Sequence, residues 1–166
     1  MKKKILITIL LFILFVTGCW AKKSKVNEYL LDDNASATEL LNQYMQGVLE
    51  SNSEKLVAVL PDFMQDDFEN IYTKEYLNEY VEYLESKYGN DIKGSVVVEE
   101  EVEVLEEDMD GINGYLLEYS NYIKPSKCYM ITGAFHLEGN ESSEDLEFGD
   151  SVARCSFNGK WRIIIA

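Results

Sequence analysis

After residue 35, apolar side chains recur at the three- and four-residue spacing of an amphipathic helix. The first stripe contains Leu40, Leu41, Tyr44, Met45, Val48 and Leu49. Ser36 and Glu39 precede it at the spacing of a capping box, so we predict a helix that begins after Ser36. Ser53 is expected to cap a second, short helix over 54–60, which Pro61 ends.

Two more helices are predicted before residue 90, one over 62–72 and a longer one over 74–88. Thr73 is a suitable N-cap for the longer helix, and Gly89 is a suitable stop. Its apolar stripe contains Tyr76, Leu77, Tyr80, Val81, Leu84 and Tyr88.

Beyond Gly89 the apolar period changes to two, which is typical of strands. Val96, Val98, Val102 and Val104 alternate with glutamates in a first strand. Asp110-Gly111 and Asn113-Gly114 predict a turn into a second strand with Tyr115, Leu117 and Tyr119 on one face. A third strand is expected over 128–137, with Tyr129, Ile131, Phe135 and Leu137 on one face. An acidic loop over 139–147, a fourth strand over 148–157, an Asn158-Gly159 hairpin and a last strand over 160–165 follow.

Helices followed by an antiparallel meander predict an α+β fold, with N-terminal helices packed on a bent antiparallel sheet of about four to five strands. The opening pattern LLNQYMQGVLESNSEKLVAVL and the closing NGKWRIII resemble the cone-shaped fold shared by nuclear transport factor two and ketosteroid isomerase. The resemblance covers residues 36–166 and implies a helix in the concave face of the sheet. It also makes a homodimer through the sheet face a candidate assembly, and it assigns no single function, because the fold hosts enzymes, binders and scaffolds.

The N-terminal residues have the pattern of an export signal. Lys2, Lys3 and Lys4 precede an apolar run over 5–16, which is short for a membrane-spanning helix. Val16-Thr17-Gly18-Cys19 then resembles a bacterial lipobox, in which the cysteine is lipidated and becomes the new N-terminus. The resemblance, to lipoproteins of Gram-positive bacteria, divides the chain into a signal peptide (1–18), a lipidated Cys19 with a tether (19–35) and one domain (36–166). An uncleaved anchor helix is the alternative.

Charge and residue counts argue against nucleic-acid partners and against metal sites. The 166 residues carry 30 acidic and 15 basic side chains, and six of the bases lie in the first 25 residues, which contain no acid. The remainder therefore has nine bases against 30 acids, a net charge of −21 that should repel nucleic acids. One histidine and three cysteines are too few for a metal site built from those residues, and no cofactor is expected.

Glu100 is the main candidate for chemistry. In an unbroken strand it shares a face with Val98 and Val102, which would direct its carboxylate into the cone and raise its pKa. Tyr44 and Tyr80 are candidate neighbours in the same cavity, as part of a tyrosine-rich helical region that forms either core or a binding wall. A bulge at 99–101 would instead turn Glu100 outward.

The two cysteines beyond Cys19 fall on adjacent predicted strands. Cys128 and Cys155 are therefore either a disulfide, which an extracytoplasmic compartment permits, or two buried thiols. His136 lies on the same strand face as Cys128, and the chain has no GxSxG motif to make it part of a triad.

The sequence contains no recognisable set of catalytic residues, so we do not expect an enzyme. We expect a non-catalytic lipoprotein on the outer face of the cell membrane, which binds an envelope protein or peptide. The alternative is a small-molecule-binding or isomerase-like cavity with Glu100 as a polar group. A filled cone favours the first function, and an enclosed cavity favours the second.

Overall fold

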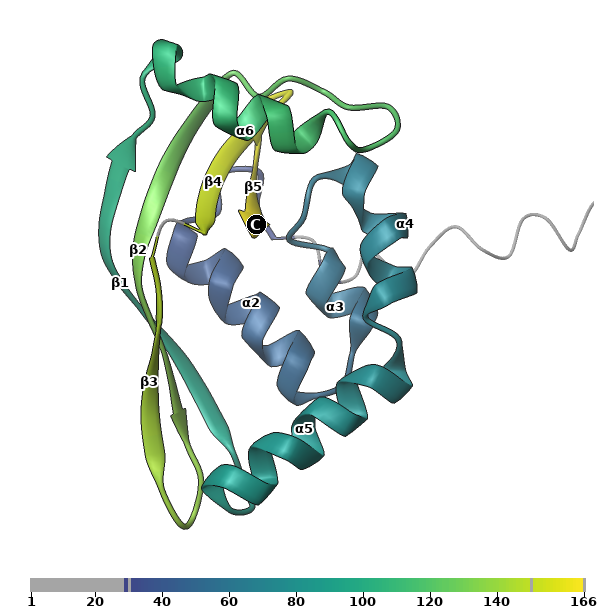
Figure 1. Ribbon diagram of the computed structural model, residues 1–166, viewed down its shortest axis with the longest axis vertical. Coiled ribbons are helices and arrows are strands. Elements are labelled where there is room, and N and C mark those ends of the chain that lie inside the picture. The colour runs from purple at the N-terminus through teal and green to yellow at the C-terminus, as the bar shows by residue number, and fades with distance from the viewer. Residues whose placement is uncertain (1–28, 30, 150, 166) are drawn as a thin grey trace, which may run out of the picture.

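The computed structural model of the protein describes residue 29, residues 31–149 and residues 151–165. The predicted signal peptide and Cys19 lie outside these ranges. Among the described residues, no helix has the length and apolar character needed to cross a membrane. Helices pack against a five-stranded antiparallel sheet, which confirms the predicted α+β class (Figure 1).

Four helices lead into the sheet, and their ends follow local sequence signals. They are α2 (Ala37–Leu49), α3 (Ser53–Val57), α4 (Asp62–Ile71) and α5 (Lys74–Tyr88). The capping box of Ser36 and Glu39 is present, Thr73 caps α5, and Gly89 ends α5 with a φ of 85°. The prediction for α3 was wrong in detail, because the Asn52 side chain accepts from the Lys55 N–H and Ser53 is already helical.

The sheet is built around one long strand. Its members are β1 (Lys93–Glu103), β2 (Lys127–Glu138), β3 (Ser143–Phe148), β4 (Val152–Phe157) and β5 (Lys160–Ile165). One edge of β2 pairs with β1, while its other edge pairs with β4 over 127–130 and with β3 over 133–138. Gly133 lies where β2 changes partner. Its φ is 156°, and a Cβ at this position would clash with the Val97 carbonyl oxygen.

The predicted turn and second strand over 110–119 were wrong. That segment forms a 3-10 turn, η2 (Glu106–Asp108), and the helix α6 (Met109–Leu116). Met109 and Leu116 are buried and Ile112 is partly buried, which is a helical spacing, while Gly111 and Gly114 face open space. Packing on the sheet therefore overrides the turn preference of these glycines.

The acidic segment over 139–147 was predicted as a loop and instead contains most of β3. The predicted fourth strand over 148–157 is divided, since β3 ends at Phe148 and β4 starts at Val152. The closing hairpin is confirmed, with Asn158 at a φ of 51° and Gly159 at 83°.

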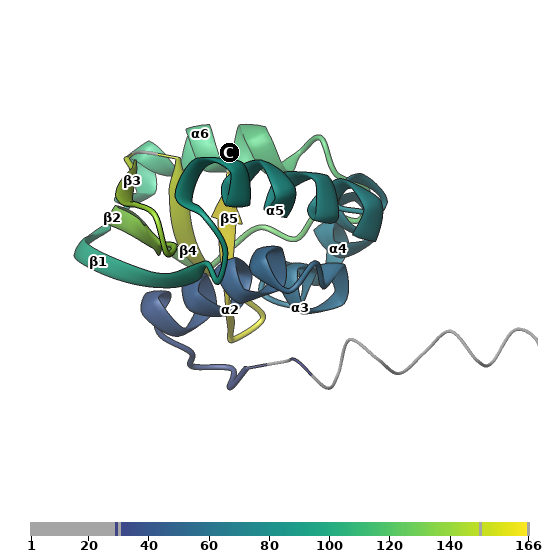
Figure 2. The ribbon, with the colours of Figure 1, turned by 90° about the horizontal axis from the view of Figure 1, so that it is seen from below.

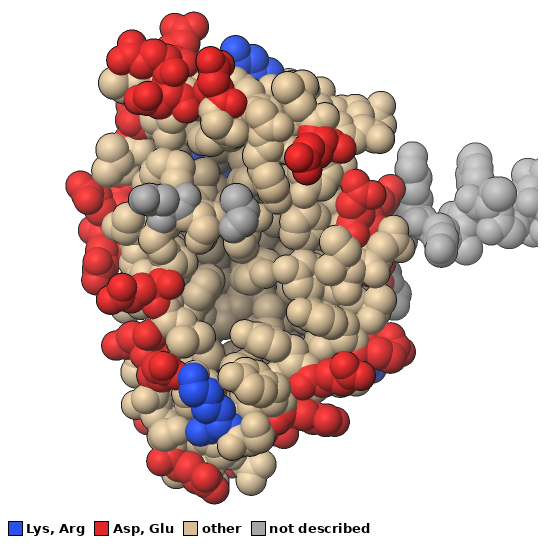
Figure 3. Space-filling model, viewed as in Figure 1, with Lys and Arg blue, Asp and Glu red and all other residues tan. Residues whose placement is uncertain are grey.

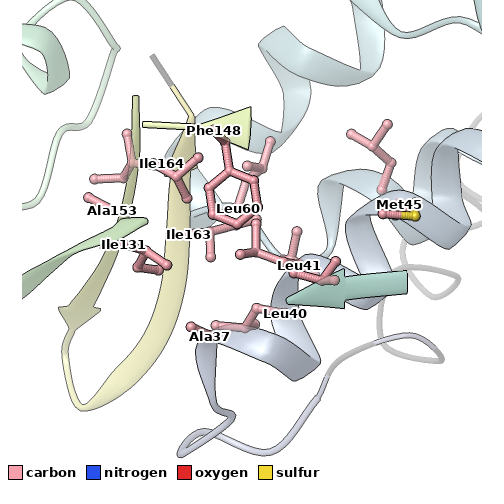
Figure 4. Packing of buried hydrophobic residues seen from close by; sticks show 14 of the residues in the cluster. Ala37, Leu40, Leu41, Met45, Leu60, Ile131, Phe148, Ala153, Ile163 and Ile164 are labelled. Carbon is pink, nitrogen blue, oxygen red and sulfur yellow. The ribbon is translucent and has the colours of Figure 1, made fainter. Parts of the chain in front are cut away.

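The main core lies at the β4–β5 end of the sheet. There α2 and α6 lie on opposite sides of β4 and β5 (Figure 2). Leu40 and Leu41 of α2 pack with Ile131 and Ile163 of the sheet (Figure 4), and all four are almost fully buried. This end therefore has both faces of the sheet covered.

Arg154 attaches the segment before α2 to the sheet. Its guanidinium donates to the Ala35 carbonyl and to the Glu101 carboxylate, and lies 4.4 Å from the Trp161 ring centroid. The backbone N–H of Trp161 also donates to the Asp33 carbonyl. These contacts fix the point at which the chain enters the domain.

Candidate binding cavity

A cavity of about 400 Å³ opens between α2, α5 and the inner face of the sheet. In the space-filling view it is a hollow between the sheet and the helices (Figure 3). Most of the surface around the hollow belongs to residues that are neither acidic nor basic, while acidic residues gather at its rim. Its volume lies within the range of small-molecule sites in proteins.

The sheet supplies an apolar wall. Phe135 and Leu137 of β2 and Leu146 and Phe148 of β3 line the cavity. The register pairs Phe135 with Leu146, and strand alternation places all four side chains on the inner face. The predicted face of the third strand is thus confirmed, and it provides apolar surface to any molecule that enters.

The helices supply a wall of phenols. Tyr44 extends from α2, Tyr72 follows α4, and Tyr76 and Tyr80 lie on α5. Tyr76 and Tyr80 are four residues apart on α5, so their side chains lie along one face of that helix, and Tyr72 precedes it at the end of α4. The rings of Tyr72 and Tyr76 meet edge to face at a centroid distance of 5.9 Å.

The phenols are held in their neutral form. Burial is the main reason that the pKa of Tyr44 lies well above its ordinary value, and the neighbouring Tyr72 phenol raises it further. Burial also raises the pKa of Tyr80, with Tyr76 as the next cause. At neutral pH these hydroxyls are therefore hydrogen-bond donors and acceptors rather than bases.

No lysine, arginine or histidine lines the cavity within the described ranges. Glu147 borders it, yet Glu147 pairs with Ala134 and so shares the outer sheet face with His136 and Asp145. His136 is engaged there, with 2.7 Å between its Nδ1 and an Asp145 carboxylate oxygen. Alternation therefore directs the Glu147 carboxylate away from the cavity.

The structure separates the three residues that the sequence suggested for a cavity. Tyr44 and Tyr80 line it. Glu100 does not, because the pairing of β1 shifts between Val98 and Glu100 and leaves Glu100 exposed opposite Thr132. This is the bulge that was the alternative interpretation.

The bulge gives the inward position to the next glutamate. Glu101 lies opposite Ile131, and its carboxylate is 2.9 Å from an Arg154 guanidinium nitrogen. An inward carboxylate is thus present on β1. It forms a salt bridge with Arg154, however, and it does not line the cavity.

One end of the cavity is closed by a contact between α5 and the β2–β3 hairpin. Lys87 and the Tyr88 hydroxyl both donate to the Glu144 carboxylate. The lysine ammonium is the main reason that the pKa of Glu144 lies below its ordinary value, and Glu144 in turn raises the pKa of Lys87. We call these three residues the latch.

The remaining candidate residues lie away from the cavity. Cys128 and Cys155 form a buried disulfide between β2 and β4. Tyr83 stacks on Tyr80 but is 57% exposed and is not part of the lining. The sequence suggested Tyr44 and Tyr80 for the cavity but not Tyr72 and Tyr76, because the full set of phenols depends on how the helices pack against one another.

No cluster of histidine, cysteine and acidic side chains suited to a metal ion is found among the residues that the structure describes. Comparison of the chain with models of known protein families, with curated proteins and with solved structures finds no match.

Proposed function

We propose that the protein is a lipid-anchored, extracytoplasmic binding protein that holds a small, largely apolar molecule in the cavity between α2, α5 and the sheet. The observation that carries this proposal is a cavity of about 400 Å³ that side chains leave unfilled, with an apolar wall opposite a phenol wall. Transfer of an apolar molecule from water to such a wall is favourable, at roughly 25 cal/mol per Å² buried.

Binding suits the cavity better than catalysis does. Glu100, the candidate acid or base, is on the exposed bulge, and Glu101 is paired with Arg154. The raised pKa values of Tyr44 and Tyr80 keep both phenols protonated, so neither is a base at neutral pH. With the lining residues that the structure describes, an isomerase-like reaction would lack a group that removes a proton.

A probe of cavity binding is N-phenyl-1-naphthylamine, an uncharged apolar dye that fluoresces when it leaves water. We expect saturable binding to the full chain in phosphatidylcholine vesicles, measured against protein-free vesicles. Val48→Trp should fill the cavity from α2 and weaken binding at least about tenfold, whereas Val97→Trp, at an exposed position of β1, should leave it unchanged. Absence of saturable binding by the unaltered protein would reject the function.

The anchor is proposed from Cys19 and the residues before it. Two acyl chains on this cysteine would supply the two signals that stable membrane attachment needs. Cys19→Ala should release or mislocalise the protein and remove the mass of the lipid. Membrane retention with no lipid-dependent mass difference in the unaltered chain would contradict lipidation.

A second candidate function, the binding of an envelope protein or a second copy of the chain, is favoured by the outer sheet face. β1 is an edge strand of the described sheet, and its Val97 and Val102 are 54% and 49% exposed on the face opposite the cavity. Crosslinking in intact cells should then capture a partner that Val97→Lys abolishes. An unchanged pattern of crosslinks would remove this candidate.

A further inference from the structure

We propose that the ligand of this cavity is an uncharged amphipathic molecule, whose oxygen-bearing polar end is hydrogen-bonded by the phenols of Tyr44, Tyr72 and Tyr76 while its apolar body lies on the sheet wall. This inference rests on the proposed binding function and deepens it, because it names the class of ligand. It follows from the groups that face the cavity and from those that do not.

The cavity offers nothing to neutralise a negative head group. Among the described residues, its lining contains no basic side chain, and acidic residues predominate around its rim, where Lys87 is already paired with Glu144 (Figure 3). A carboxylate or phosphate would give up its hydration on entry without gaining an ion pair, and it would first have to approach an acidic surface. Fatty acids and other anionic lipids are therefore disfavoured.

A positive head group would also lack a partner inside the cavity. Glu147 points to the outer sheet face, and Glu144 is engaged by Lys87 and the Tyr88 hydroxyl. The acidic rim would attract an organic cation, and tyrosine faces would stabilise it in part. Within the cavity, however, no free carboxylate would balance the lost hydration of the ammonium.

The polar groups that do face the cavity are neutral hydroxyls. After burial, the neighbours that raise the pKa of Tyr44 are three further phenols, those of Tyr72, Tyr80 and Tyr76. Tyr44 of α2, Tyr72 after α4, and Tyr76 and Tyr80 of α5 all line the helix side of the cavity, opposite the apolar sheet wall. By comparison, the Tyr115 hydroxyl outside the lining already donates to the Ile165 carbonyl and lies 3.0 Å from the Tyr119 hydroxyl.

Three probes with the same ten-carbon chain test the inference: decanol, decanoate and decyltrimethylammonium. Equilibrium dialysis would compare the full chain in phosphatidylcholine vesicles with protein-free vesicles. We expect decanol to bind at least about tenfold more tightly than either charged probe. The double variant Tyr44→Phe/Tyr76→Phe should weaken decanol binding about tenfold, as expected for the loss of one or two hydrogen bonds, and should barely alter binding of N-phenyl-1-naphthylamine.

Tyr83→Phe is the matched control, since Tyr83 lies on α5 outside the lining, and it should change nothing. Equal or tighter binding of a charged probe would overturn the inference while the dye still showed that the cavity binds. Decanol binding that the double variant leaves intact would remove the role of the phenols. If neither the dye nor any ten-carbon probe binds, the proposed function fails together with the inference.

Discussion

Helix α2 passes through two regions of the molecule that differ in how completely they are packed. Leu40 and Leu41, in its first half, are almost fully buried against the sheet. Tyr44 and Val48, one and two turns later, are only partly buried and line the cavity. The same helix therefore contributes to the core at one end and to a binding wall at the other.

The difference arises from what covers the sheet. At the β4–β5 end, α2 and α6 lie on opposite sides of the strands, and the Cys128–Cys155 disulfide joins β2 to β4 (Figure 2). Along β2 and β3, only the inner face is opposed by helices, and the cavity lies between these strands and α5, whereas β1 contacts α2 through Gly94 and Val96. We infer that the closed end supplies most of the stability, which leaves the open end free to hold a ligand.

The largest expected effect comes from a matched pair of truncations on α2. Leu41→Ala removes a fully buried side chain and should lower the free energy of unfolding by about 4 kcal/mol. Leu49→Ala, in the cavity wall, should cost about 1 kcal/mol, because its side chain is only partly buried. Urea denaturation of both variants measures the contrast, and equal losses would break the division into two regions.

Removal of the disulfide should have the next largest effect. Cys128 and Cys155 are 27 residues apart in the sequence, and closure of such a loop is worth about 3.5 kcal/mol in the chain-entropy model. Cys128→Ala/Cys155→Ala should therefore unfold at lower urea concentration and yet retain dye binding in the folded state. If the double variant lost dye binding but kept its stability, the disulfide would support the cavity rather than the core, and the division into two regions would fail.

A glycine pair tests the boundary between the regions, where β2 changes partner. Gly133→Ala places a Cβ against the Val97 carbonyl at a φ of 156° and should destabilise by more than about 1 kcal/mol. Gly111→Ala, in α6 with nothing within 4 Å, should stabilise by up to about 1 kcal/mol. Thermal denaturation compares the two, and a tolerated Gly133→Ala would contradict the close approach of the Val97 carbonyl at this point.

The smallest expected effect concerns the latch at the open end. The pKa of Glu144 is lowered, so its contribution to stability is present above its ordinary pKa of 4.5 and is lost as the pH falls through the lowered value. Lys87→Met should reduce this acid sensitivity and speed hydrogen exchange in β3, with little effect on the core. Lys93→Met is the control for charge. Equal exchange in both variants would show that Lys87 does not hold the hairpin.

Much of the fold could be predicted because its signals are local. The capping box of α2, the Thr73 cap and Gly89 stop of α5, and the Asn158-Gly159 hairpin depend on neighbouring residues, and the structure has them where the sequence predicts them. Helix α6 was not predicted because two glycines in eight residues favour a turn. The helix is stabilised by burial of Met109 and Leu116, which depends on tertiary packing.

The cavity could be predicted only in part. Helical periodicity placed Tyr80 on the buried stripe of its helix, and Tyr44 on that of α2. The Glu100 hypothesis depended on unbroken alternation, and a single extra residue in β1 reverses the direction of every side chain beyond it. Periodicity within one strand could not reveal that bulge, because it depends on how β1 pairs with β2.

The central claim, that the cavity binds an apolar molecule while the core around Leu40 and Leu56 does not take part, is tested most directly by methyl NMR of the full chain during a decanol titration. We predict saturable shifts for the methyl groups of Val48, Leu49 and Leu146, which line the cavity, and unchanged signals for Leu40 and Leu56 in the core. Unchanged lining methyls, or equal shifts in both sets, would contradict the account.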